Sequence, residues 1–212
     1  KVVKAKGLKM CFKLQTDSGK EFTSKTNLFA TGTKWRKLGV PGEEEYTNKG
    51  VHYCALCDGF AYKNKLVAVV GGSDSAAKEA LVLTQHAKKV YIIYRGDKIH
   101  PEPVNMRKIE DHMKKGKIEI IINTNVKAIN GNQKDGVTSV ILDKNPKELK
   151  LDGIFVAIGH LALSDVAKDL GVKLNQKGEI MINRNSETNF PGVYAAGDVG
   201  DTKFKQAITG VA

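Results

Sequence analysis

The chain has 212 residues, of which 41% are apolar, and a formal net charge of +11. No apolar run approaches the roughly 18 residues of a membrane span, so composition predicts one or two buried cores and no membrane partner. The lysines are scattered singly or in pairs, without the arginine-rich runs or interleaved aromatic residues of a nucleic-acid surface. We therefore expect no nucleic-acid partner. A solvated lysine-rich surface is the favoured interpretation, and a preference for acidic proteins or phosphorylated cofactors is the alternative.

The first ten residues lead into no apolar segment of the kind that a signal peptide contains, so a cytoplasmic location is expected. Short strands are predicted next, in LKMCFKLQT (residues 8–16) and NLFATG (27–32), with the turn DSGK between them. The chain therefore opens with β structure.

A βαβ unit is predicted from residue 65 onward. The apolar run 66–70 meets two glycines, apolar residues then recur at a helical period, and the run VYIIY (90–94) forms a second strand. Such a unit closes into a parallel pair with a right-handed crossover. The fold class is therefore α/β, with a Rossmann-like three-layer domain.

The remaining pattern alternates strands and helices. Helices are predicted at 104–114, 164–170 and 205–212, and strands at 118–122, 138–142, 153–159, 179–183 and 192–198.

Cys54 and Cys57 form a C-x-x-C pair in HYCALCDG (52–59), and the only other cysteine is Cys11. In a reducing compartment such a pair indicates redox or metal chemistry. A closed zinc site needs four ligands. His52 is a possible third ligand beside the two cysteines, but the sequence shows no fourth. Redox chemistry is favoured, with structural zinc as the alternative.

The segment GGSDSA (71–76) lies between a predicted strand and a predicted helix, where a dinucleotide fingerprint belongs. Gly71 and Ala76 fit the pattern G-x-G-x-x-G/A, whereas Ser73 replaces its second glycine. About 20 residues on, the second strand ends in Arg95 rather than an acid, which favours the 2′-phosphate of NADP. A surface arginine at a strand end is the alternative.

The segment GVYAAGDV (192–199) predicts a strand followed by an acid, Asp198. That carboxylate could accept a hydrogen bond from a ribityl or ribose hydroxyl, or it could simply cap a helix.

These motifs together resemble low-molecular-weight thioredoxin reductase, a flavoprotein of the pyridine nucleotide-disulfide oxidoreductases. The resemblance rests on the order and spacing of six segments, ATG (30–32), VPGEEEY (40–46), GVHYCALCDGF (50–60), VAVVGGSDSAAKEALVLT (67–84), VAIGH (156–160) and GVYAAGDVGDTKFKQAITGVA (192–212). It covers essentially the whole chain.

The resemblance implies roles for the residues around the cysteines. Cys54 and Cys57 correspond to the redox-active disulfide, with Cys57 facing the flavin and Cys54 attacking thioredoxin. Asp58 corresponds to the acid that accepts and donates the thiol protons. This role suits a reaction whose attacking group is a thiolate.

It also implies the cofactor sites. The residues expected at NADPH are Gly71, Gly72, Ser73, Asp74, Ser75, Ala76 and Arg95, with His100 at the last arginine of the family's H-R-R-x-x-x-R pattern. The residues expected at FAD are Thr31, Gly32, Gly197, Asp198, Lys205, Gln206 and Ala207. Gly96 takes the place of a further arginine in that pattern.

The resemblance predicts an NADPH-binding domain, residues 36–157, inserted into a partial FAD-binding domain, residues 1–35 and 158–212. The family's FAD diphosphate loop has no counterpart here, so a chain truncated at both ends is expected, from a parent that is usually a homodimer.

The implied activity is that of a thioredoxin-disulfide reductase, which moves electrons from NADPH through FAD and the cysteine pair to thioredoxin. Two alternatives are a nucleotide-binding fragment without flavin and a relative with another donor or a peroxidase-type acceptor.

Overall fold

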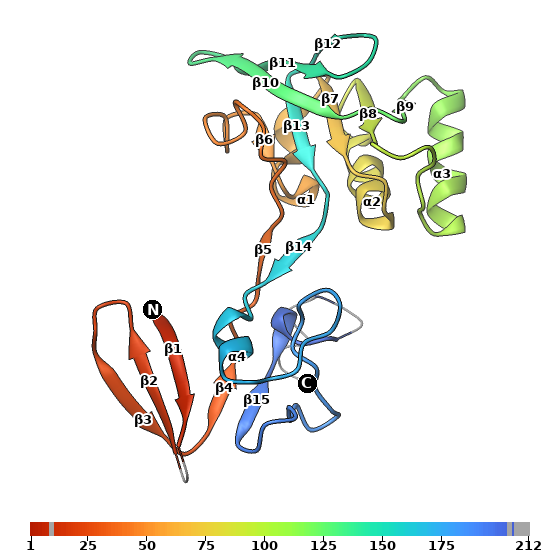
Figure 1. Cartoon of the computed structure of the whole chain (residues 1–212). Coiled ribbons are helices and arrows are strands. Elements are labelled where there is room, and N and C mark those ends of the chain that lie inside the picture. Colours follow the sequence, from red (N-terminus) through yellow and green to blue (C-terminus); the bar gives the residue numbers. More distant parts are fainter. Residues whose placement is uncertain (9–10, 203–204, 206–212) are drawn as a thin grey trace. The chain divides into compact units, whose positions relative to one another are not determined.

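A computed structural model describes the chain except for residues 9–10, 203–204 and 206–212 (Figure 1). The chain divides into two compact units. The first unit comprises residues 1–34 and 160–212, and the second unit comprises residues 35–159. Which nucleotide each unit binds stays a prediction.

A five-stranded parallel sheet organises the second unit, with the strand order β6-β13-β7-β8-β9. Its strands are β6 (Val51–His52), β13 (Gly153–Val156), β7 (Leu66–Val70), β8 (Lys89–Ile93) and β9 (Ile118–Ile121). Four helices belong to the same unit, namely α1 (Ala55–Asp58), η1 (Gly59–Tyr62), α2 (Asp74–Leu83) and α3 (Pro103–Lys114). The predicted α/β class and parallel βαβ unit are confirmed.

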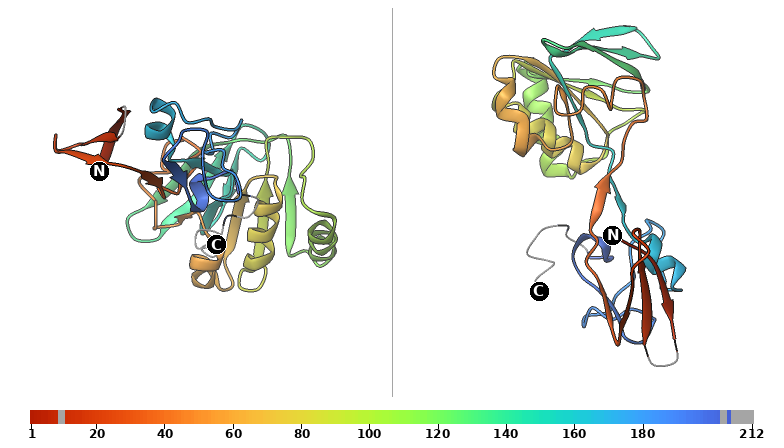
Figure 2. Two further views of the ribbon diagram at one scale, coloured as in Figure 1. Left: turned by 90° about the horizontal axis from the view of Figure 1, so that it is seen from below. Right: turned by 90° about the vertical axis from the view of Figure 1, so that its left-hand side faces the viewer.

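The sheet is the middle of three layers. Val67 and Val69 face the helices and pack with the buried face of α2, whereas Ala68 and Val70 pack against an antiparallel sheet on the other side. That sheet consists of β10 (Val126–Asn132), β11 (Gly136–Leu142) and β12 (Glu148–Lys150). Figure 2 shows the helices and these strands on opposite faces of the parallel sheet. Burial on both faces explains why β7 is apolar throughout.

The first unit is built from strands. An antiparallel sheet joins β1 (Val2–Gly7), β2 (Phe12–Thr16) and β3 (Glu21–Ser24), and a parallel pair joins β4 (Asn27–Phe29) to β15 (Val193–Ala195). The short helices α4 (Asp165–Asp169) and η2 (Gly197–Val199) complete it. Phe12, Phe29 and Ile180 belong to its core. A two-stranded sheet of β5 (Thr33–Trp35) and β14 (His160–Ala162) lies where the chain passes between units.

Two local predictions need correction, and a third falls outside the described residues. The predicted strand 8–16 begins only at Phe12, and Leu8 and Cys11 lie outside it, joined by a hydrogen bond from the Leu8 amide to the Cys11 carbonyl. The predicted strand 179–183 is absent, since Ile180 forms only isolated bridges with Leu174 and Gly200. The predicted helix from residue 205 lies almost wholly outside the described residues.

Among the described residues, no helix is both long and apolar enough to cross a membrane.

Candidate functional site

The cysteine pair lies on the turn that follows edge strand β6. Cys54 has extended backbone, φ −149° and ψ 107°, and is the N-cap of α1. This places Cys57 one turn later, and the two sulfurs form a disulfide. Cys57 is exposed and Cys54 is half-buried, so the pair is open to a reaction partner. The amide of Cys57 donates to Cys54 Sγ over 3.2 Å, a contact that favours a thiolate at Cys54 once the bond is opened.

The acid beside the pair is tied to a buried histidine. Asp58 Oδ2 lies 3.2 Å from Nδ1 of His52, and Nε2 of His52 lies 2.7 Å from the hydroxyl of Tyr62. Burial lowers the pKa of His52, although the nearby Asp58 carboxylate opposes that shift. Within the described residues no group of three or more His, Cys, Asp or Glu side chains gathers as a metal site. His52, the third ligand of the zinc alternative, instead contacts Asp58 and Tyr62.

A carboxylate from α2 binds the N-terminal end of α1, the short helix that Cys54 caps. Glu79 accepts a hydrogen bond from the backbone N–H of Ala55, the residue after Cys54. Burial raises the pKa of Glu79, and the bond from Ala55 offsets only part of that shift. Sequence reasoning missed Glu79, because 24 residues separate it from Ala55.

The glycine loop connects the carboxyl end of β7 to α2. Gly71 has φ +151°, and a Cβ there would come within 2.3 Å of the Ala157 carbonyl oxygen. At Gly72 a Cβ would come within 2.5 Å of the Tyr94 ring. Both positions therefore require glycine. Ser73 has extended backbone and makes no side-chain capping bond, so its hydroxyl is available to a ligand.

Two of the residues predicted to contact NADPH, Asp74 and Ala76, instead make contacts within the protein. Asp74 accepts hydrogen bonds from the Glu102 amide at 2.8 Å and from Asn105 at 2.7 Å, and it pairs with Lys78. Burial alone would raise the pKa of Asp74, but these bonds lower it overall. The carboxylate thus fastens α2 to α3. Ala76 is 1% exposed, and a Cβ at Gly71 would come within 2.9 Å of the Ala76 Cβ.

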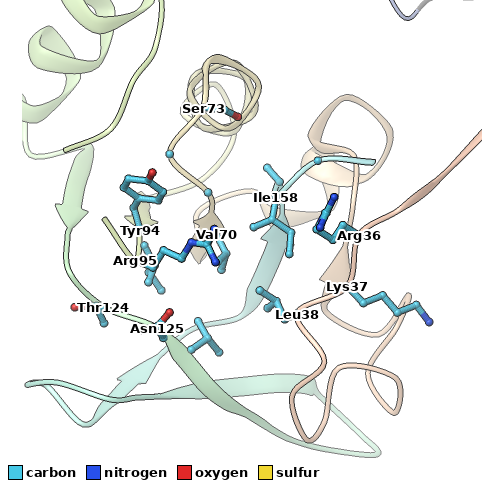
Figure 3. A pocket seen from close by; sticks show the side chains of 16 residues that line it. Arg36, Lys37, Leu38, Val70, Ser73, Tyr94, Arg95, Thr124, Asn125 and Ile158 are labelled. Carbon is cyan, nitrogen blue, oxygen red and sulfur yellow. The ribbon is translucent and has the colours of Figure 1, made fainter. Parts of the chain in front are cut away.

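A cavity of about 570 Å³ opens at the carboxyl edge of the parallel sheet, the edge at which open α/β sheets bind ligands (Figure 3). It is lined by Arg36, Lys37, Leu38, Val70, Gly71, Gly72, Ser73, Ile93, Tyr94, Arg95, Thr124, Asn125, Val126, Ala157, Ile158 and Gly159. The structure therefore brings Gly71, Gly72 and Ser73 together with Arg95. Ser75 does not line it.

Two arginines enter this cavity from opposite sides (Figure 3). Neither Arg95 nor Arg36 forms an ion pair with an acid in the described part of the chain, whereas Lys37 pairs with Glu44. The two guanidinium groups are thus free to meet a phosphate. Arg36 was missed because it precedes the second unit's first strand, far in sequence from the glycine loop.

His100 lies beside the loop rather than in the lining of the cavity. Its amide donates to the Gly72 carbonyl over 2.6 Å, and its ring meets Tyr94 edge-on with centroids 6.2 Å apart. The His100 ring is exposed.

The residues predicted at the flavin gather at one edge of the first unit. Because β4 and β15 are parallel neighbours, Thr31 and Gly32 follow one strand where Gly197 and Asp198 follow the other. Both glycines have positive φ, +67° and +73°, which lets the chain turn sharply at this edge. Thr31 already donates to the Leu163 carbonyl over 2.7 Å.

Lys205 reaches back to the same edge. Its Nζ lies 3.1 Å from the Asp198 carbonyl oxygen and 3.0 Å from Glu179 Oε1. Gln206 and Ala207 lie outside the described residues.

Residues 1–212 match the family described as pyridine nucleotide-disulphide oxidoreductase. The chain is 38% identical over 203 residues to a thioredoxin reductase of Listeria innocua, covering 93% of this chain and 62% of that protein. It is 36% identical over 201 residues to a thioredoxin reductase of Bacillus subtilis, with the same 93% and 62% coverage. The crystal structure of Lactococcus lactis thioredoxin reductase matches with a TM-score of 0.79 and 36% identity, covering 100% of this chain and 69% of that one. The chain thus spans 62% of the length of these two curated relatives.

Proposed function

The chain belongs to the pyridine nucleotide-disulphide oxidoreductase family, and we propose that it supplies the NADPH site and the redox disulfide of a thioredoxin-disulfide reductase. One observation carries this proposal. The Cys54–Cys57 disulfide and the cationic cavity at the carboxyl edge of the sheet belong to the same compact unit. The likeness to thioredoxin reductases of Listeria innocua and Bacillus subtilis supports it.

The dinucleotide would lie across the glycine loop. Backbone amides at Gly72 and Ser73, together with the N-terminus of the ten-residue helix α2, suit its pyrophosphate. Arg95 offers a planar, permanently charged fork to the 2′-phosphate, and Arg36 supplies a second cation across the cavity. Two arginines that form no ion pair within the described residues fit a ligand with several phosphates, and this favours NADPH over NADH.

The flavin would be held at the edge formed by β4 and β15. Thr31, Gly32, Gly197, Asp198 and Lys205 are the described residues that we assign to it, and Gln206 and Ala207 are assigned by resemblance alone. These groups suit FAD, because hydroxyl, amide and carboxylate groups lie together where two parallel strands end. When bound, FAD would supply the route by which a hydride from NADPH becomes two electrons for the disulfide.

The chain's own chemistry is thiol–disulfide exchange. Cys54, supported by the Cys57 amide, is the nucleophile that attacks the disulfide of thioredoxin, and Cys57 then closes the ring by attacking Cys54. Asp58 holds and returns the thiol protons. This exchange restores the disulfide seen here.

We further propose a cytoplasmic protein that works as a homodimer. A disulfide that is repeatedly opened belongs in a reducing compartment. Sedimentation analysis of the full-length protein that carries this chain tests the oligomeric state.

The activity is tested in that full-length protein, loaded with FAD and titrated with NADPH. We expect the flavin absorbance to bleach with NADPH and thioredoxin to be reduced in turnover. A flavin that millimolar NADPH leaves oxidised would contradict the donor assignment. Turnover that survives Cys57→Ser would contradict the assignment of the disulfide.

A further inference from the structure

His52 is a buried histidine beside the cysteine pair. The proposed function assigns it no role. Its side chain is 9% exposed, and both ring nitrogens face polar groups of the following turn. Nδ1 lies 3.2 Å from Asp58 Oδ2, and Nε2 lies 2.7 Å from the Tyr62 hydroxyl. The three side chains therefore form a row that ends at the acid next to Cys57.

Close packing fixes the position of Tyr62. A Cβ at Gly153 would come within 2.3 Å of its ring, so only glycine admits the tyrosine there. Phe155 meets the Tyr62 ring edge-on at 5.4 Å and stacks on His52 at 5.2 Å. The hydroxyl and the imidazole consequently have little freedom to rotate. This rigidity suits a pair that holds a third group in place.

Protonation decides which atoms carry the hydrogens. Burial lowers the pKa of His52, so the ring is neutral near pH 7 and carries one N–H. Burial also raises the pKa of Tyr62 to about 12, so its hydroxyl keeps its proton. Because a carboxylate can only accept, we assign the single N–H to Nδ1, which faces Asp58, and the Tyr62 hydroxyl then donates to Nε2. Nδ1 is buried and forms no hydrogen bond within the described residues, and the Asp58 carboxylate lies within ion-pair distance of it at 3.2 Å.

The other charged groups around this row are few. Lys65 Nζ lies 5.6 Å from the centre of the Tyr62 ring. Asp152 acts on Tyr62 electrostatically, in the same direction as Asp58. Among the described residues, no lysine or arginine forms an ion pair with Asp58, which contacts His52 instead.

Dithiol–disulfide exchange moves two protons. Cys54 first gives up its thiol proton, its thiolate attacks one sulfur of the acceptor, the acceptor S–S bond breaks, and the leaving thiolate takes up that first proton. The Cys57 thiol then loses its proton and attacks Cys54 Sγ, which releases the second acceptor thiolate to take up the other proton. The cysteines lose two electrons and the acceptor gains two. A carboxylate next in sequence to Cys57 can carry these protons if it is held in place.

We propose that His52 is a positioning residue that orients the Asp58 carboxylate for proton transfer during dithiol–disulfide exchange, with Tyr62 fixing the imidazole. This inference rests on the proposed redox function of Cys54 and Cys57. It concerns only groups of this chain, and its test needs no flavin.

The test measures the rate at which the reduced 212-residue chain, with Cys11→Ser throughout, reacts with two small disulfides. One is aliphatic, and proton transfer assists the departure of its basic thiolate. The other is aromatic, and its acidic leaving thiolate does not. His52→Phe keeps the ring packing and removes both nitrogens, His52→Asn keeps a donor near the Nδ1 position, and His86→Asn is the matched control.

We expect His52→Phe to slow the aliphatic reaction about tenfold, a part of the roughly hundredfold that general acid–base catalysis contributes, and the aromatic reaction less than about twofold. His52→Asn should recover most of the lost rate, and His86→Asn should match the parent. In an Asp58→Asn background, His52→Phe should have no further effect, because His52 acts through Asp58.

Equal slowing with both disulfides, or additive losses in the Asp58→Asn background, would mean that His52 only packs the turn and would overturn the inference. An unchanged aliphatic rate in His52→Phe would overturn it as well. If the parent chain reacts with neither disulfide, the redox assignment of the cysteines fails, and the inference fails with it.

Discussion

The ring of Tyr94 lies so close to Gly72 that a Cβ at Gly72 would sit 2.5 Å from its Cδ2. Gly96 packs against the same ring, since a Cβ there would sit 2.6 Å from Tyr94 Cε1. The two glycines therefore let one aromatic ring close over the loop that we assign to the pyrophosphate. This ring also lines the cavity.

Gly72→Ala should displace the Tyr94 ring and cost about 1 to 3 kcal/mol of stability, the usual penalty of overpacking. Nucleotide binding should weaken too, because the loop must shift away from its phosphate. Denaturant unfolding and calorimetric titration with NADPH measure the two effects. Adding Tyr94→Ala should recover stability by making room. A double variant that is less stable than Gly72→Ala would contradict this account of the glycine.

Arg95→Ala should weaken the binding of NADPH by about 1.5 to 3 kcal/mol, the range for a lost hydrogen bond to a charged group. The binding of NADH should be nearly unchanged. The reason is that only NADPH has a 2′-phosphate for the guanidinium to bind. Calorimetric titration of both nucleotides measures the difference. Arg184→Ala, an exposed arginine of the first unit, is the control. Equal losses for NADPH and NADH would show that Arg95 does not read the 2′-phosphate.

Much of this site could be predicted from sequence because its signals are local. The run 66–70, the two glycines and the helical period from Ala76 are contiguous, and they led to β7, α2 and β8. The spacing of Cys54 and Cys57 likewise indicates redox or metal chemistry, whereas the disulfide itself is implied by the family resemblance.

Contacts between distant segments could not be predicted in this way. Arg36 reaches the cavity because β13 returns the chain to the sheet between β6 and β7, and Gly159, just beyond β13, accepts a hydrogen bond from the Arg36 amide. Strand β10 has Asn130, Gly131 and Asn132 at its end, which predict a loop, yet pairing with β11 makes it a strand. The family resemblance predicts Asp74 at the nucleotide, and only the packing of α3 reveals its bonds to Glu102 and Asn105.

Cys57→Ser should trap thioredoxin as a stable mixed disulfide with Cys54. The serine cannot attack Cys54 Sγ, so the second half of the exchange stops. Mass spectrometry of the reduced variant, mixed with oxidised thioredoxin in a Cys11→Ser background, measures the adduct. Cys54→Ser should give much less of it. Equal trapping by both variants would contradict the assignment of Cys54 as the nucleophile.

Glu79→Ala should destabilise the chain by about 1 to 3 kcal/mol, because the amide of Ala55 loses its partner at a half-buried site. Glu79→Gln should cost less, since its amide oxygen can accept the same bond. The two variants also differ from the parent in pH dependence. Burial raises the pKa of Glu79 in the folded chain above its value of 4.5 in the unfolded chain, so the folded chain binds this proton more tightly.

The parent's stability from Glu79 is therefore fully present below the unfolded pKa and declines as the pH rises through the folded pKa. Glu79→Gln cannot lose a proton, so its stability relative to the parent should improve from pH 4 towards pH 7. Denaturant midpoints at four pH values measure this trend, with Glu110→Gln on the exposed face of α3 as the control. A difference between Glu79→Gln and the parent that does not change with pH would mean that Glu79 has the same pKa in the folded and unfolded chains.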